Sequence, residues 1–148
     1  MDDQRTQWTE VLSVGVDQID EEHQHFIRLL DRFNHAETRS LPEAELYAML
    51  AEVVLYTEQH FTNEEGLMRD AGYPFLDQHH MMHDMAEQEV HRLASGTASE
   101  EEIREVLGRF MLNWLVLHIQ SADRKFGEWL QETGAEKPRE AAYLQLAV

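Results

Sequence analysis

The sequence predicts an all-α protein, an antiparallel up-and-down four-helix bundle with an N-terminal arm packed across it. Three observations support this fold class. The chain has 148 residues, about one domain's worth, and only 3 Pro and 7 Gly. Pro42, Pro74, Gly72, Gly96 and Gly134 separate long segments whose apolar positions repeat every three or four residues, as on one face of an α-helix. The connections are short, which favours antiparallel packing of consecutive helices.

Turn and capping signals give the expected helix boundaries. Turn sequences at 40–42, 72–74, 95–97 and 133–134 leave four helical segments, 19–37, 43–71, 75–94 and 100–132. Ser99 and Glu102 fit a capping box at the start of the last helix, and Pro42 and Pro74 suit first-turn positions. Gly72, Gly96 and Gly134 suit the left-handed residue that follows a helix end.

The chain therefore divides into an N-terminal arm (1–18), a bundle (19–132) and a C-terminal tail (133–148). We expect the arm to pack across the bundle because it carries the apolar residues Trp8, Val11, Leu12, Val14 and Val16. The end of the tail, 141–148, is apolar enough to dock or to bind a partner, although chain termini are commonly disordered.

Composition excludes several function classes. The absence of Cys excludes disulfides, Cys-ligated zinc or iron–sulfur sites and thiol catalysis. A net charge of −17 repels nucleic acids and anionic membranes, so neither is expected as a partner. The longest uncharged run, 110–122, is shorter than the ~18 residues of a spanning helix, and the first residues do not form a secretion signal. We therefore expect a cytoplasmic protein.

Histidines interrupt the apolar stripe of all four predicted helices. The five are His23, His60, His79, His83 and His118. One histidine in such a stripe is usually a core residue whose hydrogen bonds are satisfied. Five at one level, together with Glu64, would leave buried polar groups without hydrogen bonds, and each such group costs several kcal/mol of stability. A bound cation would accept their lone pairs. His60 with Glu64, and His79 with His83, are also spaced for chelation on one helix face.

The ligand types narrow the choice of metal site. Imidazoles suit iron, copper, nickel or zinc, and the carboxylate of Glu64 is able to bridge two ions. A zinc protease is disfavoured because His80 stands where its helix needs a Glu base. The carboxylate-rich di-iron class needs two Glu-x-x-His pairs, and the chain has one, Glu22 with His25. A histidine-dominated site fits better.

The spaced motifs of residues 8–130 resemble the hemerythrin family, in particular its bacterial members. They are Trp8, the run Val14-Gly-Val-Asp-Gln-Ile-Asp-Glu-Glu-His23, His60-Phe-Thr-Asn-Glu64-Glu-Gly-Leu-Met68, Tyr73-Pro74 with His79 and His83, and Trp114-Leu-Val-Leu-His118-Ile-Gln-Ser-Ala-Asp123.

The resemblance implies two non-haem iron ions (Fe²⁺/Fe³⁺) joined by an oxo or hydroxo bridge. It assigns His79, His83 and His118 to one iron, His23 and His60 to the other, and Glu64 and Asp123 to both as bridges. Asp123 rests on the resemblance alone, because five residues after His118 it would lie about 140° away around an ideal helix.

The resemblance also implies an apolar O2 pocket, although the same residues would serve simply as bundle core. Its predicted lining is Phe61, Trp114, Leu115, Ile119 and Phe126. We expect the other histidines, His25, His35, His80 and His91, to be solvated. Glu65 is expected to face outward, about 100° around the helix from Glu64.

The function implied is reversible O2 binding for carriage, storage or delivery by a monomer that is not an enzyme. Five neutral imidazoles with only two carboxylates tolerate ferrous iron better than a carboxylate-rich site does. NO or small anions are further ligands for the open iron. An O2, NO or redox sensor acting through a partner is one alternative. A di-iron oxidase, peroxidase or NO-scavenging enzyme is another, disfavoured because the predicted stripes contain no further acid or base.

Overall fold

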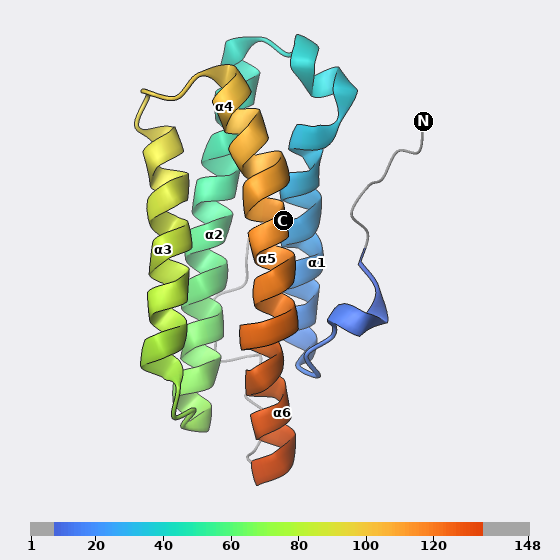
Figure 1. The fold of residues 1–148 in the computed structure, drawn as a ribbon, viewed down its shortest axis with the longest axis vertical. Helices are drawn as coiled ribbons and strands as arrows, with labels where there is room; N and C mark the ends of the chain where they lie inside the picture. Colours follow the sequence, from blue (N-terminus) through green and yellow to red (C-terminus); the bar gives the residue numbers. More distant parts are fainter. Residues whose placement is uncertain (1–7, 135–148) are drawn as a thin grey trace.

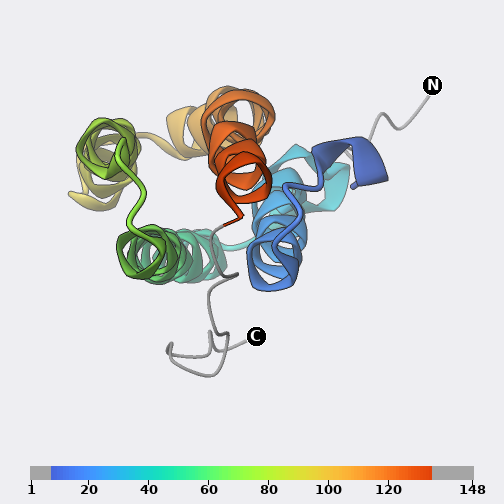
Figure 2. The same cartoon turned by 90° about the horizontal axis from the view of Figure 1, so that it is seen from below.

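A computed structural model describes residues 8–134, and within them the chain forms an antiparallel four-helix bundle (Figure 1). Seen from one end, the four helices stand at the corners of a quadrilateral around a common core (Figure 2). The first three helices are α1 (Asp17–Asp31), α2 (Glu43–Ala71) and α3 (Leu76–Ala94). The fourth is continuous and comprises α4 (Glu100–Glu105), α5 (Leu112–His118) and α6 (Arg124–Thr133), joined by two π-helical segments. The predicted fold class is confirmed.

The first helix is shorter than predicted. It ends at Asp31 and is followed by two 3₁₀ turns, Arg32–Asn34 and Ala36–Ser40. The extended backbone of His35 (φ −72°, ψ 133°) separates the two turns. Asn34 donates its side-chain amide to the Gly108 carbonyl at 2.6 Å, a contact that favours a turn over continued helix. The prediction to residue 37 failed because this contact comes from a distant helix.

The other boundaries agree closely with the capping signals. The second helix begins and ends as predicted, and the Gly72 that follows it has φ 75°. The third begins one residue later than predicted and ends at Ala94. Ser99 accepts a hydrogen bond from the Glu102 backbone N–H at 3.1 Å, which satisfies one of the free donors at the start of α4.

Two π-helical segments interrupt the fourth helix, at Val106–Met111 and Ile119–Asp123. A π-turn brings residues five apart, rather than four apart, onto the same side of a helix. Such turns occur often at functional sites. The second segment lies directly between α5 and α6 and ends on Asp123.

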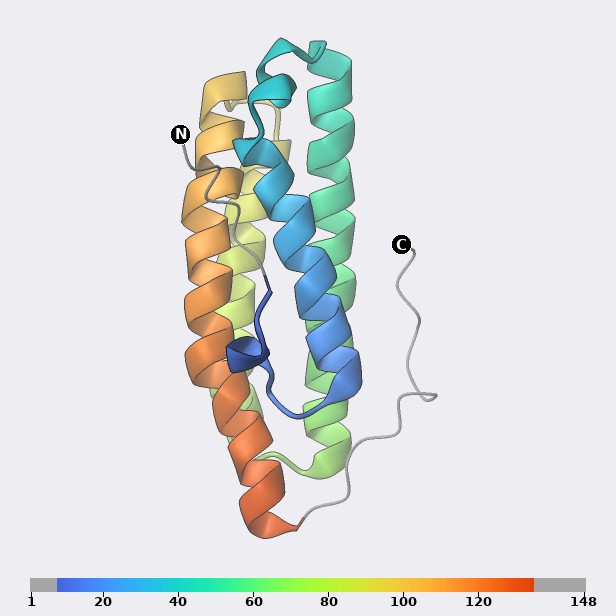
Figure 3. The ribbon, with the colours of Figure 1, turned by 90° about the vertical axis from the view of Figure 1, so that its right-hand side faces the viewer.

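The N-terminal arm runs along the bundle between α1 and the fourth helix (Figure 3). Leu12, Val14 and Val16 are buried, as predicted, but Val11 is 67% exposed. Val11 points away because the 3₁₀ turn Glu10–Leu12 directs the adjacent Leu12 into the core instead.

Polar contacts anchor the described part of the arm at Val11, Ser13 and Val14. Asp20 accepts hydrogen bonds from the Ser13 hydroxyl (2.5 Å) and the Val14 backbone N–H (2.9 Å). The Arg124 guanidinium donates to the Val11 carbonyl. Gly127 allows α6 to approach the arm closely, because a Cβ there would overlap the Val14 carbonyl oxygen. Residues 1–7 of the arm and 135–148 of the tail lie outside the described part of the chain.

The bundle interior is largely apolar, and most of its buried polar side chains are the histidines and carboxylates described below. Its fully buried side chains include Phe26, Phe61, Phe126, Leu30 and Leu67. Within residues 8–134, no helix has the length and apolar character needed to cross a membrane.

Candidate metal centre

Five imidazoles and two carboxylates meet in the bundle interior, with contributions from all four helices. Helix α1 supplies His23, α2 supplies His60 and Glu64, α3 supplies His79 and His83, and the fourth helix supplies His118 and Asp123. Their exposed fractions range from 0% to 6%. All seven residues singled out in the sequence are thus brought together, in two groups that each have the ligand types of a metal site.

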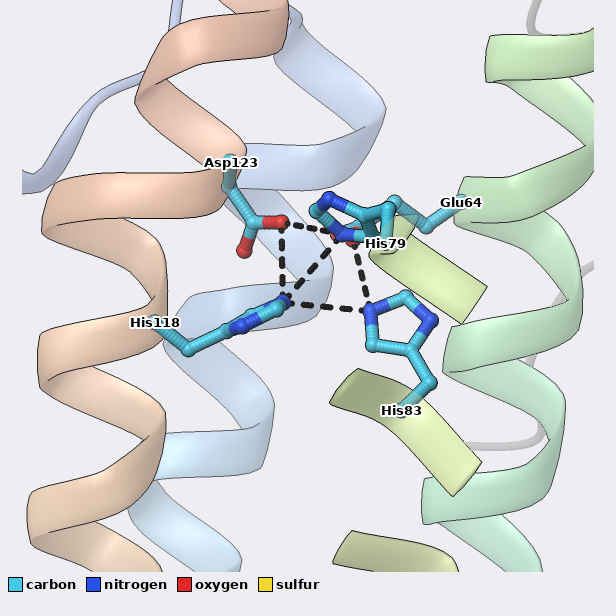
Figure 4. Close-up of side chains that lie close together, drawn as sticks. All are labelled: Glu64, His79, His83, His118 and Asp123. Carbon is cyan, nitrogen blue, oxygen red and sulfur yellow. Dashed lines mark hydrogen bonds and ion pairs between the residues drawn. The ribbon is translucent and has the colours of Figure 1, made fainter. Parts of the chain in front are cut away.

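The first group contains three imidazoles and one oxygen of each carboxylate (Figure 4). The His118 Nε2 lies 3.1 Å from the His83 Nε2 and 3.2 Å from the His79 Nε2. Glu64 Oε1 lies 2.8 Å from the His79 Nε2 and 3.1 Å from the His83 Nε2. Asp123 Oδ1 lies 3.0 Å from the His79 Nε2 and 3.2 Å from the His118 Nε2.

The second group contains the imidazoles of His23 and His60 with Glu64, and the second oxygen of Asp123 lies beside His23. Glu64 Oε2 lies 3.2 Å from the His23 Nε2 and 3.4 Å from the His60 Nε2. Asp123 Oδ2 lies 3.1 Å from the His23 Nε2. Glu64 and Asp123 therefore each direct one oxygen to the three-histidine group and the other to the two-histidine group, which is the arrangement that a bridging carboxylate requires.

The π-helical segment explains how Asp123 reaches this cluster. On a regular α-helix it would lie about 140° away from His118. The segment Ile119–Asp123 widens the helix there and brings the carboxylate onto the side of the His118 ring. Helical periodicity in the sequence therefore missed Asp123, since no periodic pattern signals a single π-turn.

The hydrogen bonds on the far sides of two rings test whether a cation fits. His60 Nδ1 lies 2.8 Å from Glu22 Oε1, and His83 Nδ1 lies 2.9 Å from Glu65 Oε2. A carboxylate only accepts, so each Nδ1 carries a proton, and each ring in its neutral, metal-binding form would turn a lone pair at Nε2 toward Glu64. Both oxygens of Asp123 are also buried, and the polar atoms beside them are the Nε2 atoms of His23, His79 and His118. Lone pairs that face one another in this way fit a bound metal ion.

The electrostatics of the metal-free cluster favour positive charge. Burial alone would lower the pKa of His60, but hydrogen bonds to Glu22 and Glu64 outweigh it and raise this pKa to about 10. Asp123 and Glu64 likewise overcome the effect of burial at His79 and raise its pKa to about 10. Hydrogen bonds from four histidines hold the pKa of the Glu64 carboxyl well below its usual value, against the opposing effect of burial. A bound cation would supply the same positive charge.

Two glutamates behind the imidazoles were not anticipated. Glu22 is buried beside the predicted stripe; its Oε1 contacts His60, and its Oε2 accepts from Gln18 (2.9 Å) and Asn63 (3.3 Å). The expectation that no further acid lies near the stripes is therefore wrong. Its spacing offered a signal, since Glu22 follows Ile19 by three residues and precedes Phe26 by four.

Glu65 does not face outward as predicted. Its side chain is 13% exposed and contacts His83. Helix α3 packs alongside α2, so a position about 100° from Glu64 faces the neighbouring helix instead of solvent. Sequence periodicity identifies the core face of a helix but not the flank that a neighbour covers.

Two of the five predicted pocket residues, Phe61 and Trp114, contact rings of the cluster. Phe61, Leu115, Ile119 and Phe126 are buried, and Trp114 is half-buried. The Phe61 ring stacks on His83 with centroids 3.9 Å apart, and the Trp114 ring stacks on His118 at 4.6 Å. Phe61 is farther from His60, at 5.7 Å. Both aromatic rings therefore pack mainly on the three-histidine group.

The remaining histidines lie outside the cluster. The side chains of His80 and His91 are 61% and 52% exposed, in line with the prediction. His25 and His35 are half-buried, His25 against the Tyr56 ring and His35 beside Asp31.

Comparisons with known proteins agree with this geometry. The sequence model of the hemerythrin HHE cation binding domain matches residues 14–130. The bacteriohemerythrin of Stenotrophomonas maltophilia is 33% identical over 121 residues, which cover 82% of this chain and 78% of that protein. That of Pseudomonas aeruginosa is 26% identical over 129 residues, 87% of this chain and 84% of that protein.

A solved structure of wild-type hemerythrin has the same fold, with a TM-score of 0.75 and 26% sequence identity. The alignment covers 83% of this chain and 95% of that one. A family match over most of the bundle and a cluster of histidines and carboxylates inside it lead to one conclusion: this chain belongs to the hemerythrin family.

Proposed function

We propose that the protein binds O2 reversibly at a centre of two non-haem iron ions. His79, His83 and His118 would hold one iron, His23 and His60 the other, and Glu64 and Asp123 would bridge them. The observation that supports this most directly is the division of each carboxylate, with one oxygen near each histidine group. Two bound ferrous ions would supply the electrons that reversible O2 binding requires.

The unequal number of histidines gives the two groups different roles in this proposal. With three imidazoles on one side and two on the other, the second group has one protein ligand fewer and leaves a position open for a small ligand. Phe61, Leu115, Ile119 and Phe126 would exclude water from the surroundings of the cluster because they are apolar and buried. Trp114 would cover the His118 ring.

Absorption spectroscopy tests the function. Protein loaded with ferrous iron under anaerobic conditions would be measured before air, after air, and after the O2 is removed again. We expect an O2-dependent band that disappears on evacuation. A band that decays irreversibly would favour an oxidase, a scavenger or a redox sensor over a carrier, and the absence of any O2-dependent change would refute O2 binding.

Iron content tests the ligand assignment separately. The His60→Ala variant should retain one iron per chain in place of two, because the two-histidine group loses half of its imidazoles. The His91→Ala variant is the control, since His91 is exposed and outside the cluster. Two irons per chain in the His60 variant would refute its role as a ligand.

A further inference from the structure

All the proposed ligands are buried, so an arriving metal ion has to cross the wall of the bundle. Part of that wall is aromatic, with Phe61 stacked on His83 and Trp114 stacked on His118. A hydrated divalent ion that crossed such a layer would lose water ligands without replacement, at a large cost in free energy. A route lined by carboxylates and imidazoles avoids this cost because each side chain replaces a water ligand in turn.

One chain of polar side chains leads from the three-histidine group to the surface between α2 and α3. His83, 1% exposed, contacts Glu65 Oε2 through Nδ1 at 2.9 Å. Glu65, 13% exposed, contacts the His80 Nδ1 through its other oxygen at 2.5 Å. His80 is 61% exposed. Exposure thus rises stepwise from the buried ligand to solvent, and each step is within hydrogen-bond distance.

The other glutamate behind the centre does not make the same connection. Glu22 contacts His60 through one oxygen, but its second oxygen accepts from the Gln18 and Asn63 amides. The Tyr56 hydroxyl donates to its backbone carbonyl at 2.9 Å. The second oxygen of Glu22 therefore contacts only neutral amides. The second oxygen of Glu65 instead contacts an exposed imidazole, a side chain able to bind a metal ion.

Further carboxylates lie on the flank between α2 and α3. Glu58 of α2 pairs with His91 of α3 at 2.8 Å. Burial and then the negative charges of Glu65 and Glu58 raise the pKa of Glu87. A concentration of negative charge increases the local concentration of divalent cations.

We propose that His80 and Glu65 form a transient capture site for a divalent metal ion, at the outer end of the route that loads the three-histidine group. The proposal rests on the proposed metal-binding function. His80 Nδ1 and Glu65 Oε1 bind the arriving ion in exchange for water. Glu65 then releases its hydrogen bond to the His83 Nδ1, and its rotation carries the ion past the edge of the ring to the His83 Nε2 and Glu64 Oε1, which lie 3.1 Å apart.

Stopped-flow metal uptake tests the route. The metal-free full chain would be mixed with Co²⁺ in the absence of O2, and the ligand-field absorption of the bound ion followed. We expect His80→Gln to slow uptake severalfold, because the capture site loses one of its two ligands. Release to a chelator should slow by the same factor, because a route residue changes both rates and leaves the dissociation constant unchanged.

His91→Gln is the matched control. His91 is similarly exposed on α3 and pairs with a glutamate of α2, but it lies outside the chain of contacts to His83. We expect its uptake rate to equal that of the wild type. Glu65→Gln should also slow uptake, and the double variant with His80→Gln should be less than additively slow, as for two residues on one route.

Three results would overturn the proposal: uptake in His80→Gln as fast as in wild type, an equal slowing in His91→Gln, or a changed dissociation constant in place of changed rates. Because Co²⁺ uptake needs no O2, the route can be confirmed even if the O2 spectrum refutes the proposed carrier function. A wild-type chain that takes up no Co²⁺ would overturn the route, and the O2 spectrum of the iron-loaded protein would still test the carrier function separately.

Discussion

Glu22 shows how a single residue outside the proposed ligand set acts on the centre. Its carboxylate accepts the Nδ1 proton of His60, which fixes the ring's tautomer and orientation and makes Nε2 a stronger donor. The Gln18 and Asn63 amides hold the carboxylate in place. Because this partner acts through His60, its influence belongs to the two-histidine group.

Glu22→Gln should therefore weaken one of two metal-binding steps by about 10- to 100-fold while leaving the other unchanged. Isothermal titration of the metal-free protein with Co²⁺ resolves the two steps. Glu21→Gln is the matched control, since Glu21 is the exposed neighbour on the same helix. Equal affinities in wild type and Glu22→Gln would show that the hydrogen bond to His60 has no role in holding the ion.

Leu115 tests the proposed apolar surroundings of the centre. It is fully buried on α5, one turn before His118. Leu115→Ala should lower the free energy of unfolding by about 2–5 kcal/mol and leave a cavity. Because that cavity would admit water to the proposed di-iron centre, air oxidation of the iron-loaded protein to the diferric form should accelerate.

The control for this prediction is Leu107→Ala. Leu107 is equally buried on the fourth helix but lies in the first π-helical segment, away from the ligands. It should lose comparable stability without faster oxidation. Equal oxidation rates in the Leu115 variant and wild type would refute the assignment of Leu115 to the proposed pocket.

At the scale of elements, the fourth helix and the arm depend on each other. The second π-helical segment orients Asp123, and α6, which follows it, packs closely against the arm at Gly127. The arm therefore packs against the fourth helix directly after the π-turn that positions Asp123. Loss of this packing should lower the free energy of unfolding and, as a smaller effect, shift the position of Asp123.

Gly127→Ala distinguishes close packing from helix propensity. Alanine in a helix is intrinsically better than glycine by about 0.5–1 kcal/mol, so propensity alone predicts stabilisation. The added Cβ would overlap the Val14 carbonyl, so we expect destabilisation by about 1–3 kcal/mol as the arm moves away. Denaturant unfolding gives the sign of the change in stability, and hydrogen exchange reports on the arm.

The control is Glu128→Ala, at an exposed site of the same helix. Its stability should stay within about 0.5 kcal/mol of wild type. A Gly127→Ala variant more stable than wild type would contradict the close packing.

At the scale of the whole molecule, the buried cluster links the stability of the metal-free protein to pH. The pKa values of His60 and His79 are raised to about 10 in the folded state from 6.5 in the unfolded state. The folded state thus binds protons more tightly, so this contribution to stability is fully present below pH 6.5 and is lost as pH rises through about 10.

Urea unfolding of metal-free protein from pH 6 upward checks this, with stability expected to fall across the interval. His60→Gln and His79→Gln should each flatten the profile, because glutamine does not titrate. The affinity for the metal ion should rise over the same interval, because an imidazole binds the ion only in its neutral form. A metal-free stability that rises toward pH 10 would contradict the raised pKa values.

Much of the architecture and of the site follows from local patterns in the sequence. The helix boundaries at Glu43, Ala71 and Ala94 agree with turn and capping signals because these act between residues close in the chain. Five histidines in the apolar stripes indicated a buried centre because helical spacing alone places them on the inner faces. Family resemblance added Asp123, which helical periodicity did not indicate.

Packing between distant segments decided the rest. Asn34 ended the first helix early by bonding to Gly108, 74 residues away. The alignment of α1 with α2 brought Glu22 to His60, and that of α3 with α2 brought Glu65 between His83 and His80. The sequence by itself determined which residue types face the core, because side-chain direction repeats with the helix. Only the tertiary structure decided which flanking carboxylates reach them, because that depends on how neighbouring helices align and on where one π-turn lies.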